Sequence, residues 1–243
     1  MDLDARMKRY EAVTNIALIR RMPVILRFDM CHGHTFTKGL NKPFDPIYMK
    51  TMQDTMLALC KDIQGCVFGY TQSDEITLVL IDYQTLETDP WFDNRLEKLC
   101  SVGASKATRY FNKFFIVNTK NQNLDNSDIY TRKFFEAEFD CRAFNVPKED
   151  VCNCVLWRQQ DAEKNSISAL AQTLFSQKEL NGISRKGLQD KMFTEKNVNW
   201  NDLSTDKKRG SACKKDVNGK WYVDKEMPVL SKEREYVEHV IMI

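Results

Sequence analysis

The residues best suited to perform chemistry are acids placed at the ends of short apolar runs. Asp29 ends the run PVILRFD, and Asp74 stands beside Glu75 in the stretch FGYTQSDEITLVL. Carboxylates are poor strand residues and are costly to bury without partners. The pair Asp74–Glu75 is therefore either a solvated turn between two strands or a place where positive charge is bound.

A divalent cation would explain the acids if they meet. In a sheet made from a strand, a helix and an antiparallel hairpin, the first strand usually lies beside the hairpin, which would bring Asp29 and Asp74 to one edge. Neighbouring carboxylates repel unless a cation neutralises them, and Mg²⁺ prefers hard oxygen ligands together with water and substrate phosphates. Two such ions can assist the attack of a nucleotide hydroxyl on a phosphoryl group. The pattern also arises by chance, so on its own it leaves the solvated turn open.

The elements that must position these acids follow from periodicity and chain breakers. Asp45 can cap a helix whose first position is Pro46 and which Gly65 can close. Asn218-Gly219 between strand-like flanks indicates a hairpin. The pattern further predicts helices over 5–20, 91–115 and 161–180, strands over 23–29, 66–71 and 76–82, strand character over 132–147 and a polar loop over 121–128. No repeat or linker divides the chain, which indicates one α+β domain with a C-terminal extension.

The composition indicates an ordinary soluble globular protein. The chain has 243 residues, of which 42% are hydrophobic and 29% charged, and its net charge of +2 provides no broad basic field. No apolar run approaches the ~20 residues that span a bilayer, and the charged N-terminus lacks the apolar centre of a signal peptide. We therefore expect a cytoplasmic protein with no membrane contact. Its eight cysteines should be reduced structural thiols, and the absence of a C-x-x-C pair argues against zinc.

The order of five segments gives the chain a family resemblance. RFDMCHGHTF, NKPFDP, GYTQSDEITLVL, FDCRAFNVP and WRQQD follow one another as they do in the tRNA-His guanylyltransferase family. The resemblance covers residues 27–180 and continues weakly beyond them. It implies a polymerase/cyclase-like palm, with an antiparallel sheet and flanking helices, over residues 1–150. A helical and β C-terminal extension over 151–243 would pack with it as one compact unit.

The resemblance assigns two Mg²⁺ ions to the acid pair. Asp29 and Asp74 would be the metal carboxylates, and the backbone carbonyl of residue 30 would be a further ligand. The family usually has glycine there, whereas this chain has Met30, so the ligand survives only if the backbone at this position does not require glycine. Glu75 would be a supporting catalytic residue, with the solvated-turn interpretation left open.

Nucleotide and RNA contacts are implied in the same way. The residues expected near the nucleotide and its triphosphate are His34, Lys42, Asp45, Ser73, Arg95 and Lys98. By the same resemblance, Arg27, Arg142 and Asn165 are expected near tRNA. A later basic stretch, taken from its charge and not from the resemblance, is expected near the tRNA backbone and contains Lys207, Lys208, Arg209, Lys214 and Lys215. A solvated surface remains the alternative for this basic stretch. Phe36 would be a packing residue or a base-stacking residue.

One departure from the family pattern selects a branch. After WRQ, tRNA-His guanylyltransferases proper carry a His-Ile-Asn-Asn signature, whereas this chain has Glu163, Lys164, Asn165 and Ser166. Only Asn165 matches, which points to the guanylyltransferase-like branch of 3′-to-5′ polymerases.

The expected activity is template-dependent repair of 5′-truncated tRNA by a homotetramer. ATP would activate the 5′ end by adenylylation, and GTP or another nucleoside triphosphate would then be added. Three alternatives stay open: G addition specific to tRNA-His, a nucleotide cyclase that needs no RNA, and a non-catalytic tRNA-binding module.

Overall fold

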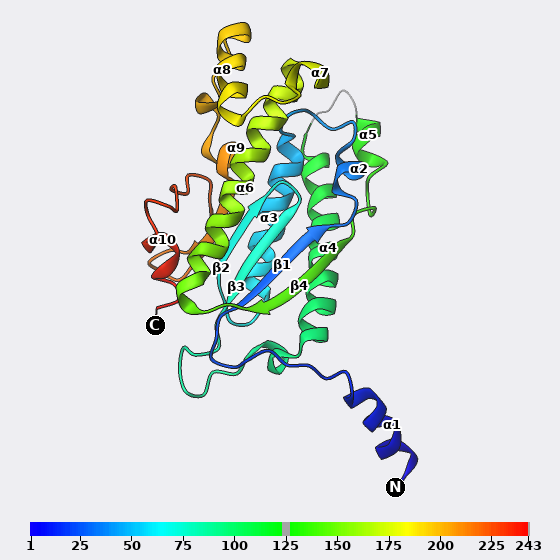
Figure 1. The fold of residues 1–243 in the computed structure, drawn as a ribbon. Coiled ribbons are helices and arrows are strands. Elements are labelled where there is room, and N and C mark those ends of the chain that lie inside the picture. The colour runs from blue at the N-terminus through cyan, green and yellow to red at the C-terminus, as the bar shows by residue number, and fades with distance from the viewer. Residues whose placement is uncertain (123–126, 243) are drawn as a thin grey trace.

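A six-stranded antiparallel sheet forms the centre of the computed structural model, which describes residues 1–122 and 127–242 (Figure 1). The strand order is β4-β1-β3-β2-β5-β6. The strands are β1 (Val24–Met30), β2 (Cys66–Gln72), β3 (Glu75–Leu80), β4 (Phe139–Asn145), β5 (Ser211–Lys215) and β6 (Trp221–Asp224). The α+β fold class predicted from the sequence is confirmed.

Helices cover the two faces of the sheet unequally. They are α1 (Leu3–Ala12), α2 (Gly33–Thr37), α3 (Pro46–Asp62), α4 (Leu96–Lys120), α5 (Ser127–Thr131), α6 (Lys148–Leu174), α7 (Gln177–Leu180), α8 (Arg185–Lys196), α9 (Thr205–Arg209) and α10 (Glu235–Glu238). Helices α3 and α4 pack on one face, while α6 lies in front of β2 and β3 on the other and leaves β1 and β4 uncovered in that view (Figure 1). Within the described residues, no helix is long and apolar enough to cross a membrane.

Alternation along β1 creates the two cores. Leu26 and Phe28 enter the core beneath α3 and α4, whereas Ile25 enters the core that α6 covers. Arg27 and Asp29 share the Ile25 face, because side chains alternate along a strand. The functional face of the sheet is therefore the one that α6 only partly covers.

The elements predicted from local signals around the acid pair are confirmed. Asp45 caps α3 by accepting a hydrogen bond from the Tyr48 amide at 2.8 Å, and Pro46 occupies the first helical turn. Strand β1 lies beside β3, with Asp29 opposite Glu75. The expected hairpin near Asn218-Gly219 joins β5 to β6.

Several predicted boundaries are wrong. Helix α1 ends at Ala12 rather than at 20, and none of its residues is buried within the described part of the structure. The segment predicted as a helix from 91 starts with a short 3₁₀ turn, Trp91–Asn94, in which Phe92 and Asp93 have left-handed backbone angles. The strand predicted over 132–147 is limited to β4. Part of the loop predicted over 121–128 falls on residues 123–126, outside the described residues.

The C-terminal part differs most from the expectation. Helix α6 starts at Lys148, directly after Pro147, and not at 161. Proline fits the start of a helix as well as the end of a strand, so Pro147 does both. The final strands extend the same sheet, since β5 pairs with β2, and α8 packs with the end of α6 in a third apolar cluster.

Candidate active site

Three segments converge at the acid pair. Asp29 lies near the end of β1, and Asp74 lies in the two-residue turn between β2 and β3, where the Met30 amide donates a hydrogen bond to the Asp74 carbonyl at 3.0 Å. Ser73 holds this turn in a left-handed conformation with φ of 50°. Gly33, at the start of α2, lies so close that a Cβ there would stand 2.1 Å from Asp74 Oδ2. The expected meeting of Asp29 and Asp74 at one edge is confirmed.

The acid pair is electrostatically unfavourable by itself. Partial burial raises the pKa of Asp29, and the charges of Asp74 and Asp140 raise it further, whereas Arg142 and Arg27 lower it. The nearby guanidinium of Arg142 already pairs with Asp140 at 3.6 Å. Two half-buried carboxylates with like charge are a donor set that suits a hard divalent cation such as Mg²⁺.

Such a cation would need ligands beyond side chains. Among the described residues, no group of three or more His, Cys, Asp or Glu side chains is arranged to hold a metal. Asp29 and Asp74 would supply two ligands, leaving the rest to backbone, water and substrate phosphate. Met30 is not among the residues with positive φ, so its backbone does not require glycine. The condition for a carbonyl ligand at this position is met.

Glu75 is a buried ion-pair partner, and the solvated-turn interpretation of it is wrong. It is the first residue of β3 and is 7% exposed. Arg158 Nε of α6 donates to Glu75 Oε1 at 2.6 Å, and Arg158 also reaches Asp161 at 3.1 Å. Burial raises the pKa of Glu75 while Arg158 opposes this shift. The ion pair holds α6 against the sheet beside Asp29. Arg158 lies in the segment WRQQD, but the sequence alone did not indicate this role.

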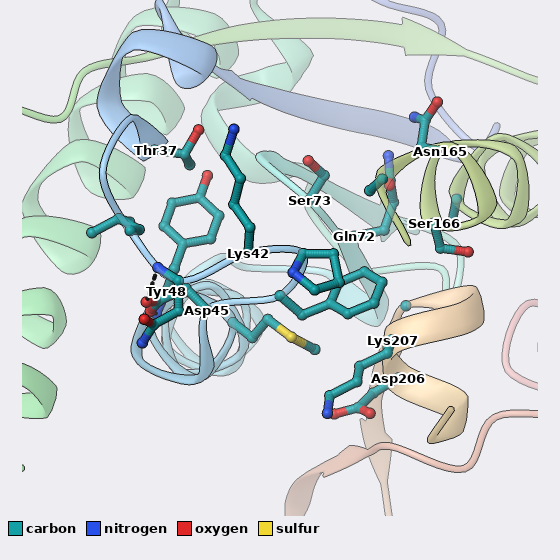
Figure 2. A pocket seen from close by; sticks show the side chains of 18 of the residues that line it. Thr37, Lys42, Asp45, Tyr48, Gln72, Ser73, Asn165, Ser166, Asp206 and Lys207 are labelled. Carbon is teal, nitrogen blue, oxygen red and sulfur yellow. Dashed lines mark hydrogen bonds between the residues drawn. The ribbon is translucent and has the colours of Figure 1, made fainter. Parts of the chain in front are cut away.

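A cavity of about 270 Å³ adjoins the Asp74 turn (Figure 2). Its walls come from the α2–α3 segment, the β2–β3 turn, α6 and α9. The predicted residues that line it are Lys42, Asp45, Ser73, Asn165 and Lys207, and lining residues that sequence reasoning missed include Thr37, Tyr48, Gln72 and Asp206. His34 lies on α2 next to Gly33, with an exposed side chain. The structure therefore gathers three of the six predicted nucleotide residues, Lys42, Asp45 and Ser73, around one cavity.

The carboxylate of Asp45 is fully engaged within the protein. It accepts hydrogen bonds from the Tyr48 amide, from the Tyr130 hydroxyl at 2.5 Å and from the Asn41 amide at 3.1 Å, and it is 6% exposed. These contacts fold the segment that carries Lys42 against α3. Asp45 shapes the cavity wall and has little accessible surface for a ligand.

Tyr48 connects the cavity with the acid pair. Its hydroxyl lies 3.8 Å from the Met30 sulfur and points toward the ends of Thr37 and Lys42 (Figure 2). Burial raises the pKa of Tyr48 well above its ordinary value, and the charges of Asp74 and Asp29 add to this effect. The phenol therefore stays protonated; its O–H donates to the Met30 sulfur in this structure and can turn to a ligand oxygen in the cavity.

The predicted basic residues do not form one surface. Lys207 lines the cavity, but Lys208 donates to the Asn201 carbonyl at 2.6 Å and Arg209 pairs with Glu163 at 2.9 Å. Lys214 and Lys215 lie over the rings of Tyr236 and Trp221.

Arg95 and Lys98 lie far from the cavity. Arg95 bridges to Ala17 just before α4, and the neighbouring Asn94 carbonyl accepts from Leu18, ahead of the start of β1. Met30 is at the other end of β1, about 20 Å of strand away. Phe36 is a packing residue, 8% exposed and edge-on to Phe111.

Known proteins share this whole architecture. The family model described as "Thg1: tRNAHis guanylyltransferase" matches residues 4–147, which is more than half of the chain. A bacterial tRNA(His) guanylyltransferase (Thg1)-like protein in complex with ATP is similar over 100% of both chains, with 43% identity and a TM-score of 0.90. A structure of a bacterial Thg1-like protein with GTP is similar over 100% of both chains, with 38% identity and a TM-score of 0.80.

A curated relative agrees with these structures. A probable tRNA(His) guanylyltransferase of Dictyostelium discoideum is 26% identical over 93% of this chain and 88% of its own length. Taken with the acid pair and its adjoining cavity, these likenesses show that the chain is a nucleotidyltransferase and belongs to the tRNAHis guanylyltransferase family.

Proposed function

We propose that this protein repairs 5′-truncated tRNA by template-dependent addition of nucleotides to the 5′ end. The choice of this branch rests on the contacts that residues 163–166 of α6 make within the protein. Glu163 pairs with Arg209, and the Ser166 hydroxyl accepts from Trp200 Nε1 at 3.0 Å. This stretch holds α9 and the Trp200 turn against α6. Asn165 and Ser166 both line the cavity, and of the four residues only Asn165 matches the tRNA-His signature (Figure 2).

The reaction consists of two displacements at phosphorus. A 5′-phosphate oxygen of the tRNA attacks the α-phosphorus of ATP, so that a P–O–P anhydride forms and pyrophosphate leaves. The 3′-hydroxyl of an incoming nucleoside triphosphate then attacks the activated 5′-phosphorus. AMP leaves, the hydroxyl proton passes to solvent, and the tRNA is one nucleotide longer. The opposite strand of the acceptor stem selects the incoming base.

The chain's own residues align these groups. Asp29 and Asp74 would hold two Mg²⁺ ions, which when bound neutralise phosphate charge and assist ionisation of the attacking hydroxyl. Lys42 and Lys207 provide positive charge for the triphosphate, while Ser73 and Tyr48 provide hydroxyl donors. Catalysis rests on alignment and charge stabilisation, as is general for phosphoryl transfer. The ATP and GTP named for the bacterial relatives support both nucleotides as ligands of this cavity.

The proposal includes a homotetrameric assembly and a cytoplasmic location. A homotetramer is supported by α1, which leaves the body of the subunit and exposes the apolar side chains Leu3, Met7 and Tyr10 (Figure 1). The cytoplasm is supported by eight free thiols, which persist in a reducing compartment.

The decisive experiment offers 5′-labelled truncated tRNAs and intact tRNA-His, separately, with Mg²⁺ and all four nucleoside triphosphates. Extension of several truncated tRNAs that stops at the completed acceptor stem supports repair. Extension confined to tRNA-His, with one untemplated G, overturns the choice of branch. A cyclic nucleotide formed from ATP or GTP without RNA would instead indicate a cyclase, and activity retained by Asp74→Ala would remove the acid pair from the mechanism.

A further inference from the structure

An exposed indole stands beside the acid pair on the open face of the sheet. Trp157, on α6, is 51% exposed although it is the largest type of side chain. The guanidinium carbon of Arg27 lies 5.5 Å from its ring centroid and that of Arg158 lies 4.5 Å away. Exposed aromatic rings set among cationic groups are the usual stacking platforms for bases of single-stranded nucleic acid.

The register of the sheet fixes how far this ring is from the reacting centre. Arg27 precedes Asp29 by two residues on β1, so their side chains share a face about 7 Å apart along the strand. On β4, Arg142 lies opposite Arg27 and Asp140 lies opposite Asp29. Trp157 is therefore one row of side chains from the acid pair, on the β1–β4 face, whereas the cavity is walled by the β2–β3 turn and α6.

Positive charge on this face is only partly used within the protein. Arg27 Nε is buried and has no hydrogen-bond partner in the described part of the chain. Arg142 pairs with Asp140 at 3.6 Å, but the two side chains are 53% and 50% exposed, which makes the ion pair weak and replaceable. Arg158, in contrast, is held by Glu75 and Asp161. The Trp157 ring therefore lies beside one arginine that is held in place, Arg158, and near two whose charge is available to a ligand, Arg27 and Arg142.

We propose that Trp157 stacks on the terminal base at the 5′ end of the RNA, while Arg27 and Arg142 contact the adjoining phosphates. This inference rests on the proposed function, because it names where the second substrate of the same site lies. A nucleic acid end is the occupant that fits, since the surface combines one free aromatic face with guanidinium groups and leads directly to Asp29. The nucleoside triphosphate occupies the cavity on the other side of the Asp74 turn.

The test compares Trp157→Ala and Trp157→Phe in the full-length protein. Loss of one base stack should weaken RNA binding, and raise the KM for tRNA, by roughly tenfold in the alanine variant, with most of the loss restored by phenylalanine. The KM for ATP should stay unchanged. Because stacking is not ionic, the dependence of RNA affinity on salt should keep its slope, whereas Arg142→Gln should lower that slope by about one.

Phe193→Ala is the matched control, since Phe193 is a 56% exposed aromatic residue on α8 and belongs to neither surface. It should leave both KM values unchanged. A 2-aminopurine placed as the 5′-terminal base should be quenched by the wild-type protein and not by Trp157→Ala, with melting temperatures confirming that both are folded.

An unchanged KM for tRNA in Trp157→Ala, or a raised KM for ATP instead, overturns the inference. These readouts separate it from the proposed function. If the wild-type protein extends no tRNA, the proposed function fails, but quenching of the terminal 2-aminopurine still decides whether Trp157 stacks on the RNA end.

Discussion

Asp29 is placed where its charge opposes folding. Its carboxyl is half-buried and faces the like charge of Asp74, and both effects raise its pKa in the folded protein above the ordinary value of 3.8. Unfolding then releases a carboxyl that ionises more readily. The charge therefore subtracts from stability above the ordinary pKa, and the penalty disappears as the pH falls below it.

We expect Asp29→Asn to abolish nucleotide addition and yet to raise the free energy of unfolding at pH 7 without Mg²⁺. The gain should be on the order of 0.5 kcal/mol, because the carboxyl is only partly buried and solvent screens it. Urea unfolding at several pH values measures this, and the difference from wild type should vanish below about pH 4. Added Mg²⁺ should raise the melting temperature of the wild type more than that of the variant.

The control for this prediction is Asp140→Asn, which neutralises an exposed carboxylate on the same face. It should retain the Mg²⁺-dependent rise in melting temperature. A destabilised Asp29→Asn protein would show that the carboxylate makes net favourable contacts in the metal-free subunit and would contradict this account of the site.

Gly33 keeps space for Asp74. A Cβ at position 33 would meet three side-chain atoms of Asp74, at 2.1, 3.0 and 3.1 Å, and Gly33 has no positive φ that would itself exclude alanine. We expect Gly33→Ala to displace the Asp74 carboxylate and to lower kcat by about 100-fold, since misplacement by 1 Å has an effect of this size. The melting temperature should change little. Thr35→Ala, on the exposed side of α2, is the control, and equal activity of both variants would sink the idea.

At the scale of elements, local signals and distant contacts were predictable to different degrees. The cap and first turn of α3, the strand β1 and the two hairpins follow from residues within a few positions of each other, and the sequence alone predicts them. The meeting of Asp29 with Asp74 also follows, because a strand–helix–hairpin order allows few arrangements. The boundaries of α6 do not follow, since Pro147 is compatible with ending a strand and with starting a helix.

Pairs brought together only by the fold lie beyond sequence reasoning. Glu75 and Arg158 are separated by 83 positions, and nothing near either residue indicates that they form a buried ion pair. The same holds for the basic stretch from Lys207 to Lys215, whose members turn to different neighbours. Charge in the sequence marks the presence of cations, but only packing decides which of them remain available to RNA.

The hydrogen bonds of Asp45 stabilise α3 and the segment before it, which together form part of the cavity wall. Asp45→Ala removes the cap of α3 and leaves the Tyr130 hydroxyl without its acceptor, so we expect unfolding to become easier by about 2–4 kcal/mol. Chemical denaturation measures this loss. Asp45→Asn keeps an oxygen for the Tyr48 amide and should lose much less stability. If Asp45→Asn instead keeps full stability but strongly raises the KM for ATP, Asp45 contacts the nucleotide directly.

The whole molecule assembles its site from both ends of the chain. The acids and the Gly33 turn come from the first third of the sequence, whereas α6 and α9 close the cavity from the last hundred residues. Strand β5 joins these parts, because it pairs with β2 in the same sheet. Residues 148–242 thus contribute to the same sheet and the same cavity as the first part of the chain, and the likeness to the bacterial structure extends over the entire chain although the family model matches residues 4–147.

Helix α1 leaves its apolar side chains uncovered in the described structure. Leu3, Met7 and Tyr10 follow helical spacing and are 65%, 42% and 69% exposed. Soluble proteins seldom leave such a face in water, so we expect it to be buried against another copy of the chain. Leu3→Ser combined with Met7→Ser should reduce the assembly to smaller species in sedimentation velocity. The double variant Asp4→Ala/Lys8→Ala, which removes the exposed ion pair on the same helix, should keep the wild-type mass. A serine variant that sediments like the wild type would show that the subunits associate through another surface.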